Sequence, residues 1–242
     1  MEDDDGDGRH RPSLASGGTT LPRRTRAYIG LGANLGDPAA TLAAAVHALA
    51  ALPGARVAGV SRLYASTPVG VADQPEFRNA VVALDVPAGP DPAAGATALL
   101  VALKGLERAF GRRERRRWAP RELDLDLLVF GRARLAIDRP PAGRSLDADT
   151  DPDRAVQLLE VPHREARDRL FVLAPLADLA PRLVPPGWGE TVRSARRRRL
   201  AVEGSGAVRP VARWDTVTGG WVPDLDQVGG GEPGAGPPAT PR

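Results

Sequence analysis

The 242-residue sequence contains no cysteine, only one lysine and few aromatic residues. The absence of cysteine excludes disulfides, a thiol nucleophile and a zinc–thiolate site. No apolar run approaches the ~18–20 residues that a membrane-spanning helix needs. The first residues are acidic and then polar, which is unlike a secretory signal. From these absences we expect a cytoplasmic protein with no membrane partner.

The single lysine, Lys104, bears on how the chain could bind a nucleotide. A Walker-type phosphate loop has the pattern G-x-x-x-x-G-K-[ST], which the residues around Lys104 do not form. The other basic residues are all arginine, and the formal net charge is only +3 because acidic residues nearly balance them. If the chain binds ATP, it must therefore use a phosphate-binding motif other than the Walker loop.

The distribution of apolar residues divides the chain into three parts. Residues 1–25 have no periodicity and are expected to be a disordered N-terminal arm. Residues 26–186 are expected to form one domain, in which the Pro-, Asp-, Arg- and Gly-rich residues 132–157 are an insertion. Residues 187–242 are expected to be a mostly irregular C-terminal extension with a candidate edge strand at 208–214.

Helices and strands of this domain are predicted in the order β-α-β-β-α-β-α. Asp37 and Asp91 each precede a proline, a combination that starts a helix. Short apolar runs predict strands at 27–31, 56–64, 79–86 and 123–130. A third short helix is expected within 161–181. Pairs of strands separated by helices favour an α+β fold, a ferredoxin-like αβα sandwich with a mostly antiparallel sheet.

The sharpest local motif is LDLDL at residues 123–127. Side chains of a strand alternate between its faces, so Asp124 and Asp126 share one face while the leucines enter the core on the other. Two such carboxylates repel each other unless a cation lies between them, and Mg²⁺ suits a site of few carboxylates completed by substrate phosphates. The competing interpretation is the solvated face of an amphipathic edge strand.

An arginine-rich segment, GRRERRRWAPR at residues 111–121, immediately precedes the two acids. Planar guanidinium groups hold phosphate oxygens that a metal ion leaves unneutralised. Trp118 adds a flat apolar surface. An isolated arginine run would otherwise be a solvated or nucleic-acid-facing surface. The continuity of the run with Asp124 and Asp126 favours a site for a phosphorylated ligand.

Further candidates for ligand binding lie in two other clusters. His163 precedes Arg169 at a spacing that suits a second phosphate-binding element, with a structural histidine as the competing interpretation. Asn79 both donates and accepts hydrogen bonds, as a heterocycle with mixed edges requires. Phe77 and Phe171 are candidates to enclose a flat ring, or are ordinary core residues.

The glycine-rich segment GLGANLG at residues 30–36 superficially resembles a dinucleotide-binding loop. Its spacing is one residue longer than that fingerprint, and no acidic residue follows about twenty positions later. The dinucleotide interpretation is therefore rejected. We expect the glycines to serve a tight strand-to-helix turn near a ligand.

Taken together, four segments resemble the 6-hydroxymethyl-7,8-dihydropterin pyrophosphokinase family of the folate pathway. They occur in the family's order at residues 28–38, 67–85, 111–131 and 161–181. The signature W-x-P-R-x-L-D-L-D-L with a downstream V-P-H is highly specific. The resemblance implies a monomeric, ferredoxin-like enzyme that binds no nucleic acid. It implies transfer of pyrophosphate from ATP to the hydroxymethyl group of the pterin, with release of AMP.

The resemblance also implies a role for each matching position. Asp124 and Asp126 match the ligands of two Mg²⁺ ions that bridge the ATP triphosphate. The catalytic candidates are Asp124, Asp126, Arg112 and Arg121. The positions that match nucleotide contacts are Glu107, Arg112, Trp118, Arg121, Leu127, His163 and Arg169. The positions that match pterin contacts are Ser66, Val69, Phe77, Asn79 and Phe171.

Departures from the family pattern leave some alternatives open. Glu114 stands where the family often has a second arginine, so Arg113 or Arg115 is the candidate for that phosphate contact. Asp126 is slightly favoured over Asp124 as the proton acceptor. The alternative functions are an arginine-rich nucleic-acid-binding protein and an inactive homologue that serves as an interaction module.

Overall fold

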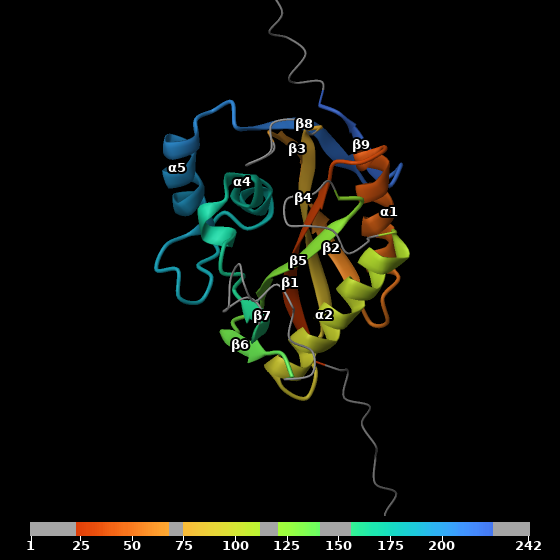
Figure 1. Cartoon of the computed structure of the whole chain (residues 1–242), viewed down its shortest axis with the longest axis vertical. Coiled ribbons are helices and arrows are strands. Elements are labelled where there is room, and N and C mark those ends of the chain that lie inside the picture. Colours follow the sequence, from red (N-terminus) through yellow and green to blue (C-terminus); the bar gives the residue numbers. More distant parts are fainter. Residues whose placement is uncertain (1–22, 68–74, 112–120, 141–155, 225–242) are drawn as a thin grey trace, which may run out of the picture.

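The structure, a computed structural model, describes residues 23–67, 75–111, 121–140 and 156–224 (Figure 1). The strands are β1 (Arg24–Ala33), β2 (Arg56–Val60), β3 (Leu63–Ser66), β4 (Phe77–Pro87), β5 (Asp124–Phe130), β6 (Leu135–Asp138), β7 (Gln157–Val161), β8 (Val208–Asp215) and β9 (Gly220–Pro223). The helices are α1 (Pro38–Ala50), α2 (Pro92–Ala109), the 3₁₀ helix η3 (Ala166–Asp168), α4 (Leu170–Leu179) and α5 (Val192–Glu203).

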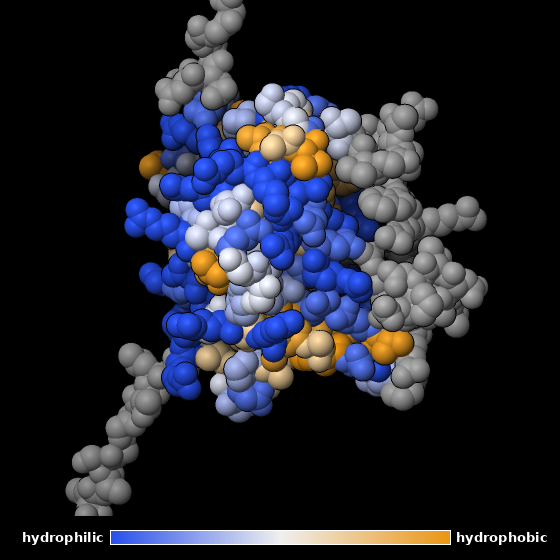
Figure 2. Space-filling view, turned by 90° about the vertical axis from the view of Figure 1, so that its left-hand side faces the viewer, coloured by the Kyte–Doolittle hydropathy of each residue, from blue (hydrophilic) through white to orange (hydrophobic). Residues whose placement is uncertain are grey.

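Within these residues, seven strands form one sheet in the order β5-β1-β4-β3-β8-β9, and β2 also pairs with β4. Every pairing in this sheet is antiparallel. Helices α1 and α2 cover one face, and α4 and α5 cover the other (Figure 1). The predicted α+β sandwich is therefore confirmed. The outer surface on the side of α4 and α5 is mainly hydrophilic (Figure 2).

Helices α1 and α2 begin where the sequence predicts. Asp37 Oδ1 accepts a hydrogen bond from Ala40 N at 3.0 Å, and Asp91 Oδ1 accepts one from Ala94 N at 2.9 Å. Each carboxylate therefore satisfies a backbone donor that the first turn of a helix leaves without a partner. The predicted stop is also confirmed, because Gly111 follows α2 with a φ of 85°, a conformation that favours glycine.

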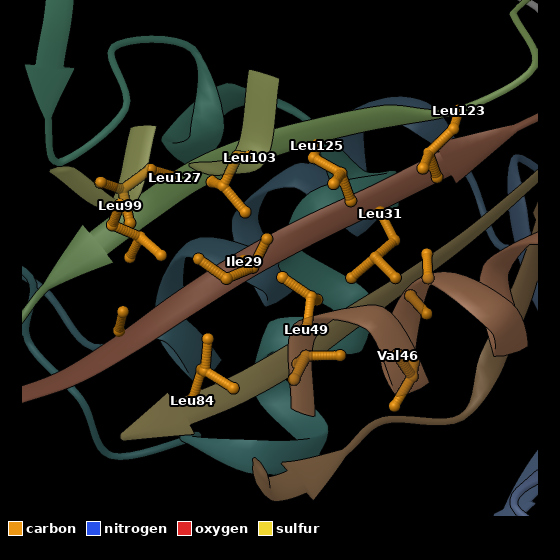
Figure 3. Packing of buried hydrophobic residues seen from close by; sticks show 14 of the residues in the cluster. Ile29, Leu31, Val46, Leu49, Leu84, Leu99, Leu103, Leu123, Leu125 and Leu127 are labelled. Atoms are coloured by element: carbon orange, nitrogen blue, oxygen red, sulfur yellow. The ribbon is translucent and has the colours of Figure 1, made fainter. Parts of the chain in front are cut away.

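Strand β5 separates the main core from the face that carries the acids. Leu125 and Leu127 are buried with Leu103 of α2 and Ile29 of β1 (Figure 3). The alternation of side chains along the strand then directs Asp124 and Asp126 to the opposite face. The predicted division of the LDLDL motif into an apolar and an acidic face is confirmed.

The predicted single strand at 56–64 is wrong, because the structure contains two strands there. Both β2 and β3 pair with β4, and Ser61 lies between them. Ser61 Oγ accepts a hydrogen bond from Val81 N at 2.9 Å and donates one to Arg62 O at 2.7 Å. The serine hydroxyl thus takes the place of a backbone partner where the chain changes course, two residues after Gly59.

Two segments are more regular than the sequence suggests. Strand β6, within the predicted insertion 132–157, pairs with β7, which begins at the last residue of that insertion, to form a second, two-stranded sheet. The described part of 187–242, expected to be mostly irregular, contains α5, β8 and β9. Strand β8 lies between β3 and β9, so the prediction of an edge strand is wrong. Helix α5 escaped prediction because only Val192 and Ala195 are buried among its arginines, too few to produce an apolar stripe.

The predicted N-terminal arm lies almost entirely outside the described residues and stays a prediction. Strand β1 begins at Arg24, just inside the limit of that arm. Among the helices that the structure describes, none is long and apolar enough to cross a membrane.

Candidate active site

Two cavities meet at the face of β5 that carries the paired acids. The first lies between β1, β4 and the start of α4, and the second lies between α2, β5 and β7. Four residues line both cavities: Arg121, Asp124, Asp126 and Arg169. The carboxylates and two arginines therefore stand where a ligand in one cavity would meet a ligand in the other.

The first cavity contains two aromatic rings and a buried amide. Phe77 begins β4, and Phe171 is the second residue of α4. Asn79 Nδ2 donates to Ser66 Oγ at 2.9 Å, which fixes the amide at the cavity wall. The guanidinium of Arg169 lies 5.6 Å from the centre of the Phe171 ring. Apolar rings with a fixed amide suit a flat heterocycle with polar edges.

Glycines of the GLGANLG motif open this cavity. Gly30 and Gly32 belong to β1 and line the cavity, so their predicted place in a turn is wrong. A Cβ at Gly30 would come within 3.3 Å of Leu128, and one at Gly32 within 3.7 Å of Asn79 Oδ1. Only Gly36 lies in the turn before α1, with a φ of 62°.

The second cavity is lined by basic side chains. They are Lys104, Arg121, His163, Arg164 and Arg169. His163 Nδ1 accepts a hydrogen bond from Glu165 N at 3.3 Å. Leu127 also lines this cavity and gives it an apolar surface. Several N–H donors around one space suit a polyphosphate.

The paired acids are electrostatically unfavourable as they stand. Burial raises the pKa of Asp126, and the neighbouring charge of Asp124 raises it further, while His163, Lys104 and Arg121 partly offset both effects. Arg121 also forms an ion pair with Asp124 through Nη1 and Oδ2. A divalent cation would relieve the repulsion between the two carboxylates.

The donor set fits magnesium. In the part of the chain that the structure describes, no cluster of three or more His, Cys, Asp or Glu residues could hold a metal ion. Mg²⁺ commonly takes one or two carboxylates and completes its shell with water and substrate phosphates. Asp124 and Asp126 beside a basic cavity provide that kind of site.

Glu107 is placed differently from the predicted nucleotide contact. It is 2% exposed and lines neither cavity. Its Oε1 accepts hydrogen bonds from Leu125 N and Lys104 Nζ, both at 2.8 Å. Glu107 therefore joins α2 to β5 and holds Lys104 at the second cavity. Sequence reasoning did not place Lys104 in the site, although its i,i+3 spacing from Glu107 is the signal of such a pair.

Asn34 is a second site residue that sequence reasoning missed. It follows β1, is 2% exposed, and accepts a hydrogen bond from Arg121 N through Oδ1 at 2.8 Å. Its Nδ2 donates to Pro75 O at 3.4 Å. Asn34 thus joins the end of β1 to the residues that precede β4 and β5. The only signal in the sequence is an amide within a glycine-rich turn.

The structure brings together most of the predicted site residues that it describes. Asp124, Asp126, Arg121 and Arg169 line both cavities; Ser66, Phe77, Asn79 and Phe171 line the first, and Leu127 and His163 the second. Three predicted residues, Val69, Arg112 and Trp118, lie outside the described residues. So do Arg113, Glu114 and Arg115, and the alternatives for that phosphate contact stay open.

A family model described as 7,8-dihydro-6-hydroxymethylpterin-pyrophosphokinase (HPPK) matches residues 28–181. The chain belongs to this family. It is 43% identical over 171 residues to the 2-amino-4-hydroxy-6-hydroxymethyldihydropteridine pyrophosphokinase of Methylorubrum extorquens. The matched residues make up 71% of this chain and 91% of that relative. It is 42% identical over 161 residues to the protein of the same name in Pseudomonas aeruginosa, over 66% and 84% of the two chains. The resemblance inferred from the motifs is confirmed.

Solved structures of HPPK-DHPS chains share the fold. One, a complex with substrates, has a TM-score of 0.58 at 12% identity and covers 79% of this chain. The wild-type Plasmodium falciparum HPPK-DHPS with pterin and p-hydroxybenzoate has a TM-score of 0.60 at 15% identity, over 80% of this chain. This chain spans about half of each, 48% of their length.

Proposed function

We propose that the protein transfers pyrophosphate from ATP to the hydroxymethyl group of 6-hydroxymethyl-7,8-dihydropterin and releases AMP, in folate biosynthesis. Membership of the family and the names of the relatives support this reaction. The observation that carries it is the position of Asp124 and Asp126 where a ring-lined cavity meets a basic one. Such a junction brings the acceptor alcohol of one ligand to the phosphates of another.

The first cavity binds the pterin in this proposal. Phe77 and Phe171 enclose the flat ring system, and the Asn79 amide, held by Ser66, hydrogen-bonds to its polar edge. Val69 belongs to the same set by its position in the sequence. The exocyclic hydroxymethyl group then extends toward β5 and the acids.

The second cavity binds ATP. Arg121, His163 and Arg169 donate hydrogen bonds to the phosphates, and Lys104 adds a positive charge held by Glu107. Leu127 packs against the adenine. Arg112 and Trp118 are assigned to the nucleotide by their match to the family's positions.

Asp124 and Asp126 would hold two Mg²⁺ ions. When bound, Mg²⁺ neutralises charge on the triphosphate and makes the β-phosphorus more electrophilic. Asp126, which lines both cavities, accepts the proton of the pterin hydroxyl. The hydroxyl oxygen forms a bond to the β-phosphorus, and the bond between that phosphorus and the α,β-bridging oxygen breaks. The electron pair remains on the α-phosphate, and AMP leaves.

The arginine run of α5 does not favour the nucleic-acid alternative. Arg198 pairs with Asp168 and Glu190, and Arg199 pairs with Glu203 at 2.7 Å. Two of the four arginines at 196–199 are therefore matched by carboxylates of the same chain. The monomeric state that the resemblance implies remains part of the proposal, and light scattering of the purified protein tests it.

Product analysis tests the reaction. The protein is incubated with Mg-ATP and 6-hydroxymethyl-7,8-dihydropterin, and the nucleotides are separated by ion-exchange chromatography. We expect AMP to appear in equal amount with the pterin pyrophosphate, and only when the pterin is present. Omission of Mg²⁺ should abolish AMP release. Release of ADP, or AMP formed without the pterin, contradicts the proposal.

A further inference from the structure

The C-terminal segment 192–215 contacts the two elements that carry the aromatic rings of the first cavity. The first contact is at the start of α4. Leu170 N donates a hydrogen bond to Glu203 Oε1 at 3.2 Å, and Arg169, the residue that precedes the helix, provides no side-chain cap. A carboxylate of α5 therefore occupies the position where a capping residue stabilises a helix and its dipole. Phe171 is the next residue along α4.

The second contact is at the start of β4. Arg209 of β8 forms hydrogen bonds to both carboxylate oxygens of Glu76, at 2.8 and 2.7 Å. Arg78 reaches the same carboxylate at 3.2 Å. Phe77 lies between Glu76 and Arg78 in the sequence. Strand β8 also pairs Val208 with Ser66, the residue that holds Asn79.

Apolar packing connects the same elements. Phe171 packs against a buried cluster that includes Tyr64, Leu170, Ala174 and Val208, together with Leu200 and Ala207. The other end of α4 is held separately, because Asp178 accepts hydrogen bonds from Tyr64 Oη at 2.9 Å and from Arg62. Release of the Glu203 contact would therefore loosen the start of α4 and leave its end fixed.

We propose that Glu203 and Arg209 are positioning residues for the pterin, which set the separation of Phe171 and Phe77 from behind the cavity. Neither residue lines either cavity, so each acts through a neighbour: Glu203 through Leu170, and Arg209 through Glu76. Both lie beyond residues 28–181, the part that the family model matches. The assignment of the cavity to the pterin rests on the proposed function, whereas the positioning of the two rings does not.

Substitutions at these positions test the inference in the full-length protein. Glu203→Ala and Arg209→Ala should each raise the KM for the pterin about five- to tenfold, the effect of a lost helix cap or charged contact. The kcat at saturation should change less than about twofold. In Arg209→Ala the KM for ATP should also change less than about twofold, because neither Glu76 nor Phe77 lines the second cavity. In Glu203→Ala the KM for ATP should rise less than the KM for the pterin, because Arg169 beside Leu170 lines both cavities. Glu203→Gln and Arg209→Lys keep a hydrogen-bonding group and should recover most of the affinity.

Controls come from the same elements. Arg197 of α5 and Arg213 of β8 are exposed, and their alanine variants should bind the pterin like the wild type. Hydrogen exchange provides a readout that does not depend on activity. In Glu203→Ala, the amides of Leu170 and Phe171 should exchange faster while the last turn of α4 is unchanged.

The outcomes separate this inference from the proposed function. If Glu203→Ala and Arg209→Ala keep the wild-type KM for the pterin and the wild-type exchange of α4, the inference is wrong. An equal rise in both KM values also overturns it, because that indicates general destabilisation. If the wild type releases no AMP but the exchange of Leu170 still depends on Glu203, the proposed function fails and the positioning of Phe171 stands.

Discussion

Asn34 and Arg121 are joined by two hydrogen bonds, from Arg121 N to Asn34 Oδ1 at 2.8 Å and from Asn34 N to Arg121 O at 3.1 Å. Because the Arg121 side chain pairs with Asp124, this link sets the place of an arginine and an acid together. The buried amide of Asn34 at the end of β1 therefore positions the residues that lead into β5.

Replacement of Asn34 should affect both stability and catalysis. In Asn34→Ala, the Arg121 amide loses its acceptor, at a cost of about 1–3 kcal/mol in the free energy of unfolding. The kcat should fall because the side chains of Arg121 and Asp124 are no longer held in position at the site. Urea unfolding and AMP release measure the two effects. Asn34→Asp keeps an acceptor for Arg121 but no donor for Pro75, so an activity no better than that of Asn34→Ala would argue against the link to Arg121.

Asp126→Asn should separate activity from stability. We expect kcat to fall by about 100-fold or more, as when a group that stabilises transition-state charge or takes a proton is lost. The metal-free variant should nevertheless be more stable than the wild type at neutral pH. Burial raises the pKa of the folded carboxyl above its unfolded value, so ionisation of Asp126 opposes folding as pH rises through that interval.

Two measurements check this expectation. Urea unfolding in EDTA should show the advantage of Asp126→Asn at neutral pH and its disappearance below about pH 4, where an unfolded carboxyl is also protonated. Steady-state release of AMP gives kcat. A near-normal rate in this variant would remove the two-metal proposal, whatever its stability.

Asp85 predicts the opposite dependence on pH. It bonds to Arg26 of β1 at 2.5 Å and to Arg56 of β2 at 2.7 Å, and these contacts, that with Arg26 first, lower its pKa against the effect of burial. A lowered pKa gives stability that is present above the unfolded pKa and is lost as pH falls below about 4. Asp85→Asn should cost roughly 1–3 kcal/mol at neutral pH. The loss in free energy of unfolding should shrink in acid. A loss that is the same at every pH would show that the charge of Asp85 is not what stabilises the fold.

The β8–β9 hairpin should contribute stability through its tryptophans. Trp221 Nε1 donates a hydrogen bond to Ser61 O at 3.0 Å. The rings of Trp221 and Trp214 pack edge to face, with their centres 4.8 Å apart. Trp221→Ala should lower the free energy of unfolding by about 2–4 kcal/mol, because a large ring is removed from a partly buried cluster. Thermal unfolding measures the loss. Val217→Ala, at a position 91% exposed, should be neutral.

The sequence predicted those parts whose signals are local. The caps at Asp37 and Asp91 and the alternation of β5 depend only on near neighbours, and the structure places them as expected. Residues that act over long separations were not predictable. Asn34 meets Arg121 across 87 positions, and Ser61 replaces a ladder partner of Val81, and nothing near either residue marks its partner.

Chemistry was more predictable than its support. The paired acids, His163 and the two phenylalanines were singled out because their residue types and spacing match a known family, and the structure places them at the two cavities. Their roles stay predictions. Lys104 and Glu107 show the limit of this reasoning. An ion pair between residues i and i+3 of a helix has the same sequence spacing whether it faces solvent or a cavity. Only the packing of α2 against β5 shows that this pair lies at the second cavity.

The border of the large sheet has a consequence for any shortened form of this chain. Strand β3 is only four residues long, and β8 pairs with its outer side. Removal of everything after residue 186 would leave the backbone donors and acceptors of β3 unpaired beside an apolar pocket. Open strands of this kind recruit other chains. A version that ends at residue 186 should therefore self-associate in a concentration-dependent way, whereas in the described part of the full chain the sheet ends at the short β9, whose last residue, Pro223, resists such addition.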